Sequence, residues 1–251
     1  MDLNLAGKTF IVTGASRGLG YATAEALVAD GANVVISGRS ADTIEAAARA
    51  LGPAATAVTA DNADPATAQK LVDTAHATYR AVHGALISVG GPPAGSALDA
   101  TDEQWRSAFE SVFLGATRIA TTTANAINGP GSIVFVLSTS VAQPIAGLAI
   151  SNGLRPGLAM VAKTLADELG PRNIRVNGLM PGRLDTDRVR ELDALAQDPA
   201  QARSRHEATI PLGRYGMPEE FGKVAAFLLS DAASYITGAM LPVDGGLARR
   251  L

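Results

Sequence analysis

The sequence predicts an α/β fold: one doubly wound parallel sheet of seven strands with helices on both faces. Short apolar runs alternate with helical stretches along the whole chain, which is typical of a parallel sheet covered on both sides. The first apolar run, residues 10–12, leads into a glycine-rich segment and then at once into a helical pattern. A chain of 251 residues that is 47% hydrophobic can bury one large core.

The apolar and helical patterns place each element in turn. Strands are expected near residues 8–13, 32–37, 55–60, 84–89, 131–138, 172–180 and 239–243. Helices are expected near residues 18–30, 40–51, 65–81, 102–127, 151–169, 187–207 and 218–230. Gly31, Gly52 and Gly170 stand just past three of these helices, where a left-handed cap is useful.

Two helix starts carry recognisable signals. Thr101 and Gln104 have the spacing of a capping box, and Pro218 suits a first helical turn. The irregular, charge-rich residues 183–210 follow the sixth strand, and we expect them to form a lid over the site. No linker or repeat divides the chain, so residues 1–251 are treated as one domain.

Composition excludes several function classes. The net charge is −3 without a basic run, so neither a nucleic-acid surface nor an anionic membrane surface is suggested. The absence of cysteine excludes disulfides and thiol chemistry, and the scattered His76, His83 and His206 lack metal-ligand spacing, so no metal site is expected. Residues 1–13 lack a signal-peptide pattern, and no apolar run approaches the roughly 20 residues of a membrane span. We expect a cytoplasmic protein that acts on a small molecule.

The glycine-rich segment 13–20 reads TGASRGLG and predicts a dinucleotide site. Glycine takes unusual backbone dihedrals freely, and a bare backbone lets a diphosphate approach closely. The helix that follows points unpaired N–H groups and the positive end of its dipole at that diphosphate. An ordinary strand-to-helix turn is the alternative, but the position after a first strand favours the dinucleotide interpretation.

The end of the second strand indicates which dinucleotide. A site for the 2′-hydroxyl of NAD usually carries an acidic residue there, whereas this chain has Ser37, Gly38 and Arg39. Arg39 and Arg17, the latter inside the glycine-rich loop, would suit a 2′-phosphate through charge-assisted forked contacts. NADP(H) is therefore favoured over NAD(H), the alternative being that both arginines are merely solvated.

Thr-Gly-x3-Gly-x-Gly resembles the short-chain dehydrogenase/reductase family, and further motifs resemble it along nearly the whole chain. They include Asn177, Pro181-Gly182 and the C-terminal segments 211–214, 218–220, 235–238 and 244–246. The nearest resemblance is to the beta-ketoacyl carrier-protein reductase-like branch, which implies a Rossmann-type fold and a homotetramer or homodimer. Its contacts would run through the helices near 102–127 and 151–169 and the C-terminal strand.

The resemblance assigns cofactor contacts position by position. Asp61 matches the aspartate near the adenine, Pro181 and Gly182 the turn beside the nicotinamide, and Leu184 and Thr186 the carboxamide contacts. Arg155 would hold the ribose, and the segment 90–93 would form a rigid loop beside the cofactor or simply a turn. The complete implied set is Gly14, Ser16, Arg17, Gly18, Leu19, Gly20, Arg39, Asp61, Gly90, Arg155, Pro181, Gly182, Leu184 and Thr186.

The catalytic positions depart from the family. Ser138 matches the family's serine, but Ser151 stands where the family has tyrosine and Arg155 where it has lysine. Val112 replaces the family's asparagine. The candidate catalytic residues are therefore Ser138, Ser151 and Arg155, joined on one wall by Asn152, which together would suit a carboxylate or a carbonyl.

This replacement leaves two hypotheses open. A phenol has a pKa near 10, whereas an aliphatic hydroxyl is a much weaker acid. Since general acid–base catalysis contributes about 10²–10⁴-fold, the chain is expected to be a slow NADP(H)-dependent oxidoreductase acting on a carbonyl or alcohol. The alternative is a catalytically silent NADP(H)-binding module, a sensor or a structural partner subunit. Lyase or isomerase chemistry on the same scaffold has little direct support.

Overall fold

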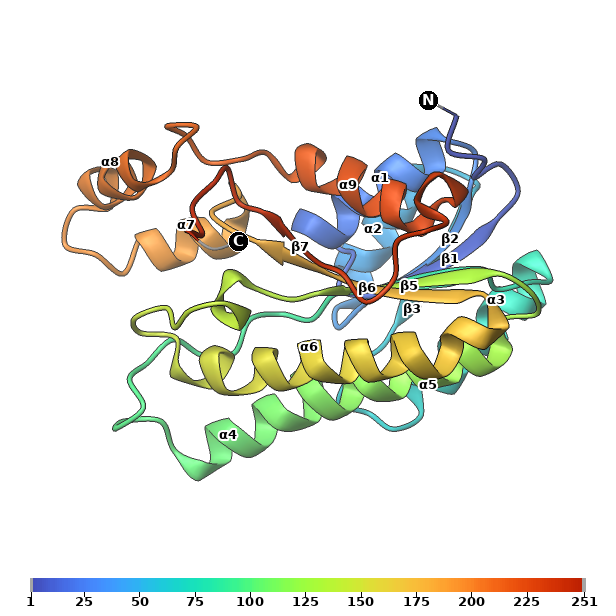
Figure 1. Ribbon diagram of the computed structural model, residues 1–251, viewed down its shortest axis with the longest axis horizontal. Helices are drawn as coiled ribbons and strands as arrows, with labels where there is room; N and C mark the ends of the chain where they lie inside the picture. Colours follow the sequence, from blue (N-terminus) through green and yellow to red (C-terminus); the bar gives the residue numbers. More distant parts are fainter. Residues whose placement is uncertain (1, 250–251) are drawn as a thin grey trace.

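The computed structural model describes residues 2–249, and its core is a seven-stranded parallel sheet (Figure 1). The strand order is β3-β2-β1-β4-β5-β6-β7, and every pairing is parallel. This confirms the expected doubly wound α/β fold. The strands are β1 (Thr9–Val12), β2 (Asn33–Gly38), β3 (Ala55–Thr59), β4 (Gly84–Ile87), β5 (Gly131–Val136), β6 (Ile174–Pro181) and β7 (Met240–Val243).

Helices cover both faces of the sheet, and each face has its own apolar core (Figure 1). On one face lie α1 (Gly18–Ala29), α2 (Ala41–Leu51) and α9 (Pro218–Leu229). On the other lie α3 (Thr67–Tyr79), α4 (Asp102–Ala108), α5 (Gly115–Ala126) and α6 (Ala149–Leu169). β1, β2, β4, β5 and β6 are largely buried on both faces, which explains their nearly continuous apolar sequence, whereas the edge strands β3 and β7 are partly exposed.

The strand order reverses between β1 and β4, and this reversal creates the crevice used for ligands in open α/β sheets. Thr13, directly after β1, spans the crevice floor. Its hydroxyl donates to the Ser88 carbonyl at 2.7 Å and accepts from the Ser88 N–H at 2.9 Å. The loops after β1 and β4 are thereby held together at the point where a cofactor would enter.

Residues 183–210 do not form the single helix expected over 187–207. Two short helices replace it, α7 (Asp187–Asp193) and α8 (Pro199–Thr209), and both lie beyond the carboxyl ends of the strands (Figure 1). Pro199 causes the break because proline cannot donate the helical hydrogen bond and disfavours helical dihedrals at Asp198 before it. Asp198 is extended and caps α8 by accepting from Gln201 N–H at 2.9 Å.

Two other expectations were wrong in detail. The helix near 102–127 is interrupted by a π-helix, Phe109–Leu114, which separates α4 from α5. Gly170 is right-handed (φ −53°) and begins a short 3-10 turn before Pro171, so the left-handed residue is Asn173 instead (φ 57°). Gly31 and Gly52 are left-handed as expected, and the capping box at Thr101 is formed.

Within residues 2–249, no helix combines the length and the apolar character that a bilayer span requires.

Candidate functional site

The glycine-rich loop has the backbone shape that a diphosphate requires. Gly14 and Gly18 are left-handed, with φ of 60° and 61°. A Cβ on Gly20 would lie 2.5 Å from the Gly14 carbonyl oxygen, and a Cβ on Gly14 would lie 2.9 Å from the Ser88 oxygen. α1 begins at Gly18 without a side-chain cap, and among the described residues the N–H groups of Gly18 and Leu19 have no acceptor. The loop therefore fits a diphosphate on a helix N-terminus.

The end of β2 lies beside this loop and carries no carboxylate. Ser16 packs against Gly38, its Cβ 3.5 Å from where a Cβ on Gly38 would be. Ser37 is buried, while Arg39 is exposed, and no described residue forms an ion pair with it. The structure thus places a free cation directly after the strand where an acidic residue would recognise NAD.

The remaining expected cofactor positions follow the carboxyl ends of β3 and β6. Asp61 follows β3 and accepts from the Ala63 N–H at 3.0 Å. Pro181 ends β6, and Gly182 packs so tightly on Asp244 that a Cβ would come within 2.6 Å. Leu184 is buried in the core, so its side chain packs against the sheet.

Thr186 lies at the base of the lid and over the loop. Its methyl carbon is 3.6 Å from where a Cβ on Gly18 would be, and its hydroxyl caps α7 by accepting from the Val189 N–H at 3.3 Å. The lid also contacts the loop after β4. Arg188 donates to the Pro92 carbonyl at 2.9 Å, and its guanidinium lies over Gly91. Gly90 beside it is exposed with open space around it.

Ser138 and Ser151 are linked through Ser140, whose hydroxyl follows Ser138 closely in the sequence. The Ser140 N–H donates to the Ser138 hydroxyl at 3.1 Å, and the Ser140 and Ser151 hydroxyls lie 3.4 Å apart. Ser140 and Ser151 are buried, at 4% and 7% exposure. The 3-10 turn Thr139–Val141 after β5 brings Ser140 back toward α6. The contact between the Ser140 and Ser151 hydroxyls depends on this turn, so sequence spacing alone does not predict it.

Arg155 points into the protein toward the strand ends. It is 5% exposed and donates to the carbonyl of Val136, the last residue of β5, and to that of Val89 after β4, the latter at 3.4 Å. Burial lowers the pKa of its guanidinium to about 10, and no described carboxylate pairs with it. Its Nε has no partner. A buried cation held only by carbonyls and lying at the crevice suits a nearby anion or a polarised oxygen.

Asn152 and Val112 do not contribute open polar groups. The Asn152 amide donates to the Ile145 carbonyl at 2.8 Å and accepts from the Ile145 N–H at 3.0 Å, so it fixes the loop before α6. Val112 is 1% exposed within the π-helix. The expected four-residue wall is therefore reduced to Ser138, Ser151 and Arg155, with Ser140 added.

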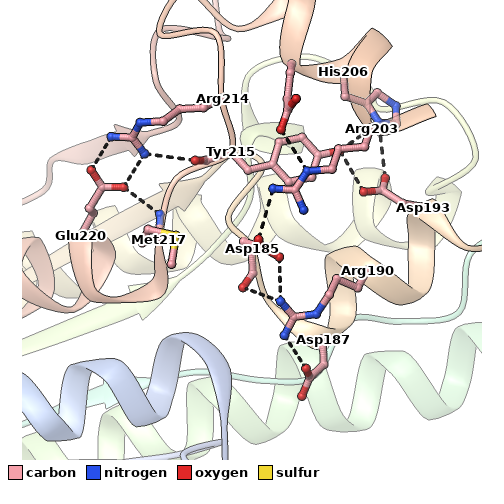
Figure 2. A network of polar contacts seen from close by, with 11 residues as sticks. Asp185, Asp187, Arg190, Asp193, Arg203, His206, Arg214, Tyr215, Met217 and Glu220 are labelled. Carbon is pink, nitrogen blue, oxygen red and sulfur yellow. Dashed lines mark hydrogen bonds and ion pairs between the residues drawn. The ribbon is translucent and has the colours of Figure 1, made fainter. Parts of the chain in front are cut away.

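Hydrogen bonds and ion pairs between arginine and carboxylate side chains stabilise the lid (Figure 2). The buried Asp193 accepts from Tyr215 Oη at 2.9 Å and from Arg183 at 2.8 Å. Burial, followed by the hydrogen bond to Asp193, raises the pKa of Tyr215 to about 12. Burial and then the nearby Arg183 lower the pKa of His206, which lies 3.1 Å from Tyr215 Oη. The phenol of Tyr215 is thus bound to Asp193 in the lid, and it does not act as the proton donor at the wall.

An apolar cavity of about 580 Å³ lies beside the wall, lined by residues such as Gly95, Trp105, Ile145, Ala149 and Asn152. Among the described residues, no group of three or more histidine and acidic side chains could hold a metal ion.

Comparison with known proteins agrees with this geometry. A sequence profile described as enoyl-(acyl carrier protein) reductase matches residues 14–248. Human dehydrogenase/reductase SDR family member 4 is 33% identical over 253 residues, which cover 98% of this chain and 90% of that protein. The 3-oxoacyl-[acyl-carrier-protein] reductase FabG of Chlamydia trachomatis is 32% identical over 253 residues, covering 97% and 98%.

Solved structures are equally similar. L-sorbose reductase from Gluconobacter frateurii, complexed with NADPH and L-sorbose, superposes with a TM-score of 0.93 at 30% identity over the whole of both chains. A short-chain type dehydrogenase/reductase from Mycobacterium marinum superposes with a TM-score of 0.91 at 28% identity, covering 99% of this chain and 98% of that one.

Proposed function

Because the chain belongs to the short-chain dehydrogenase/reductase family, we propose that it is an NADP(H)-dependent oxidoreductase that interconverts a carbonyl and an alcohol. The observation that carries the proposal is the loop over residues 13–20. Its unpaired Gly18 and Leu19 N–H groups face the crevice entrance, and its glycines leave space that a side chain would fill.

The 2′-phosphate preference is supported by the end of β2. Arg39 is exposed there without a carboxylate partner, and Arg17 lies on the neighbouring loop. An acidic residue, which would repel the 2′-phosphate, is missing from this strand end. NADPH is therefore expected to bind more tightly than NADH.

The wall formed by Ser138, Ser151 and Arg155 would handle the substrate oxygen. A bound nicotinamide supplies or accepts the hydride. Ser138 and Ser151 would hold the substrate oxygen by hydrogen bonds. During reduction, Ser151 would donate a proton to that oxygen and would regain one from Ser140. The positive charge of Arg155 near the carboxyl ends of β4 and β5 would stabilise developing negative charge on that oxygen. Because serine is a weak acid, the expected turnover is slow.

The test is direct titration of the purified protein with NADPH and NADH, followed by NADPH oxidation across a panel of ketones and aldehydes. The proposal predicts tighter binding of NADPH and turnover that falls on Ser138→Ala. Equal affinity for both nucleotides would contradict the cofactor assignment, and NADPH binding without turnover on any carbonyl would contradict the activity.

A catalytically silent NADP(H)-binding module is the second candidate. It is favoured by the way the wall satisfies itself: Arg155 donates to backbone carbonyls, Asn152 is fixed to Ile145, and Ser151 lies against Ser140. Under this alternative the protein binds NADPH but reduces no carbonyl, and Arg155→Ala changes only its stability.

We further propose a cytoplasmic homodimer or homotetramer. Phe109 and Met160, at 40% and 64% exposure, support this assembly because they expose apolar surface along the helices expected at the interface. Light scattering after size exclusion tests the proposal, and a monomer at micromolar concentration would contradict it.

A further inference from the structure

Arg17, the loop cation expected to meet the 2′-phosphate, is already engaged by the lid. Its Nη1 lies 3.0 Å from Asp187 Oδ2, and its Nη2 lies 3.7 Å from Glu191 Oε1. Both acids belong to α7. Asp187 also accepts from Arg190 at 2.7 Å (Figure 2), and this hydrogen bond is the main cause that lowers the pKa of its carboxyl. Asp187 is therefore ionised at neutral pH and faces Arg17 as a charge.

This pairing occurs where the lid base rests on the loop. Thr186 packs over Gly18, and a cavity of about 290 Å³ lies between the loop and the lid base, lined by Ser16, Arg17, Tyr21 and Asp187 among others. Arg39 differs from Arg17, since no described carboxylate pairs with it. One of the two cations expected at the phosphate is free, and the other is occupied.

We propose that Asp187 and Glu191 set cofactor selectivity by competing with the 2′-phosphate of NADP(H) for Arg17. The inference rests on the proposed NADP(H) dependence. A guanidinium makes forked contacts with one anion at a time, so binding of the phosphate by Arg17 breaks the contacts with α7. The two acids thus weaken NADP(H) binding relative to NAD(H), which has no 2′-phosphate for Arg17 to bind.

The size of the effect follows from the exposure of the pairs. The side chains of Arg17, Asp187 and Glu191 are 66%, 43% and 54% exposed, and exposed ion pairs are weak. Breaking one such pair changes an equilibrium by about two- to fivefold. We expect the closer Asp187 to have a larger influence than Glu191.

The test uses 2′,5′-ADP and 5′-AMP as probes, titrated calorimetrically against the intact protein. These nucleotides differ only in the 2′-phosphate and carry no nicotinamide, so the ratio of their dissociation constants reports the phosphate contact alone. Asp187→Asn and Glu191→Gln remove one charge each. Asp185→Asn is the matched control, because Asp185 pairs with Arg190 and Arg203 and not with Arg17.

The inference predicts that Asp187→Asn increases the preference for 2′,5′-ADP about two- to fivefold, whereas Asp185→Asn leaves it unchanged. In an Arg17→Met background the same Asp187→Asn change should have no effect on the ratio. An unchanged ratio with Arg17 present, or an equal increase without it, would overturn the inference. If the unmodified protein does not prefer 2′,5′-ADP at all, the NADP(H) assignment itself fails and the inference fails with it.

Discussion

The glycine-rich loop and the wall formed by α6 lie on the same crevice, yet they are specified by different chemistry. In the loop, backbone atoms define the site. A Cβ on Gly20, for example, would lie only 2.5 Å from the Gly14 carbonyl oxygen. In the wall, side chains define the site, and Ser151 and Arg155 are the residues expected at the positions of the family's tyrosine and lysine. A backbone site tolerates almost no substitution, whereas a side-chain site can change its chemistry while the fold persists.

The wall also shows how a changed site is kept in place. Arg155 reaches the carbonyls of Val136 and Val89, and Asn152 fixes the loop at Ile145. These groups now hold the carboxyl ends of β4 and β5 and the start of α6. The glycine-rich loop is thus held by close backbone packing, and the wall is held by hydrogen bonds from side chains to the backbone.

Gly20→Ala should have the largest effect, because its Cβ would meet a backbone oxygen that cannot move aside. Overpacking costs about 1–3 kcal/mol, so NADPH binding should weaken about 10–100-fold and the melting temperature should fall. The control is Gly170→Ala, since Gly170 is right-handed (φ −53°), lies outside the expected cofactor set, and a Cβ there meets nothing within 4 Å. Fluorescence titration measures NADPH binding, and thermal unfolding measures the melting temperature of each variant. Equal behaviour of the two variants would show that the loop is not a backbone-defined site.

Arg155→Met should separate stability and turnover from cofactor binding. It leaves the carbonyls of Val136 and Val89 without a donor, and an unsatisfied buried group costs about 1–3 kcal/mol. Removing a desolvated cation offsets part of this cost. We expect a net loss of about 1–3 kcal/mol in urea unfolding and a roughly hundredfold loss of turnover. Arg106→Met, at an exposed arginine, should change neither. Unchanged turnover in Arg155→Met would show that Arg155 does not stabilise charge on the substrate oxygen.

Thr186→Ala and Thr101→Ala form a matched pair, because each hydroxyl caps a seven-residue helix by accepting an N–H at 3.3 Å. Losing a cap costs about 0.5–2 kcal/mol, so both variants should be destabilised to a similar degree. Only Thr186→Ala should also weaken NADPH binding, since Thr186 lies over the glycine-rich loop. Calorimetry of unfolding and of binding distinguishes them. Weakened binding in both variants would contradict a specific role for Thr186.

Tyr215 should give the smallest effect, seen only in alkali. Its pKa is raised from 10 to about 12, so the folded state holds the phenol proton more tightly than the unfolded state. The resulting stability is fully present below pH 10 and is lost as the pH rises toward 12. Unfolding midpoints measured from pH 8 to pH 11.5 should therefore fall more steeply for the unmodified protein than for Tyr215→Phe. Parallel curves would show that the phenol is not held by Asp193.

Residue patterns predicted the fold, since the sheet depends on apolar periodicity and on turns that require glycine. The seven strands and the start of α1 at Gly18 were confirmed. The prediction of a single helix over residues 187–207 was wrong. A charged segment has weak periodicity, and the helix break at Pro199 was not recognised. The partners of Arg155, Ser140 and Arg17 could not be predicted, because they depend on long-range contacts that no local spacing encodes. An Arg17–Asp187 pair spans 170 residues of sequence.

We propose that hydride transfer occurs at the wall formed by Ser138, Ser151 and Arg155. The most direct measurement is a single turnover with NADPH that carries deuterium at both C4 positions of the dihydronicotinamide, mixed with excess protein and a panel of carbonyl compounds. The account predicts an alcohol that carries one deuterium, with transfer lost in Arg155→Met. NADPH that binds stoichiometrically but retains all of its deuterium with every carbonyl would contradict the account.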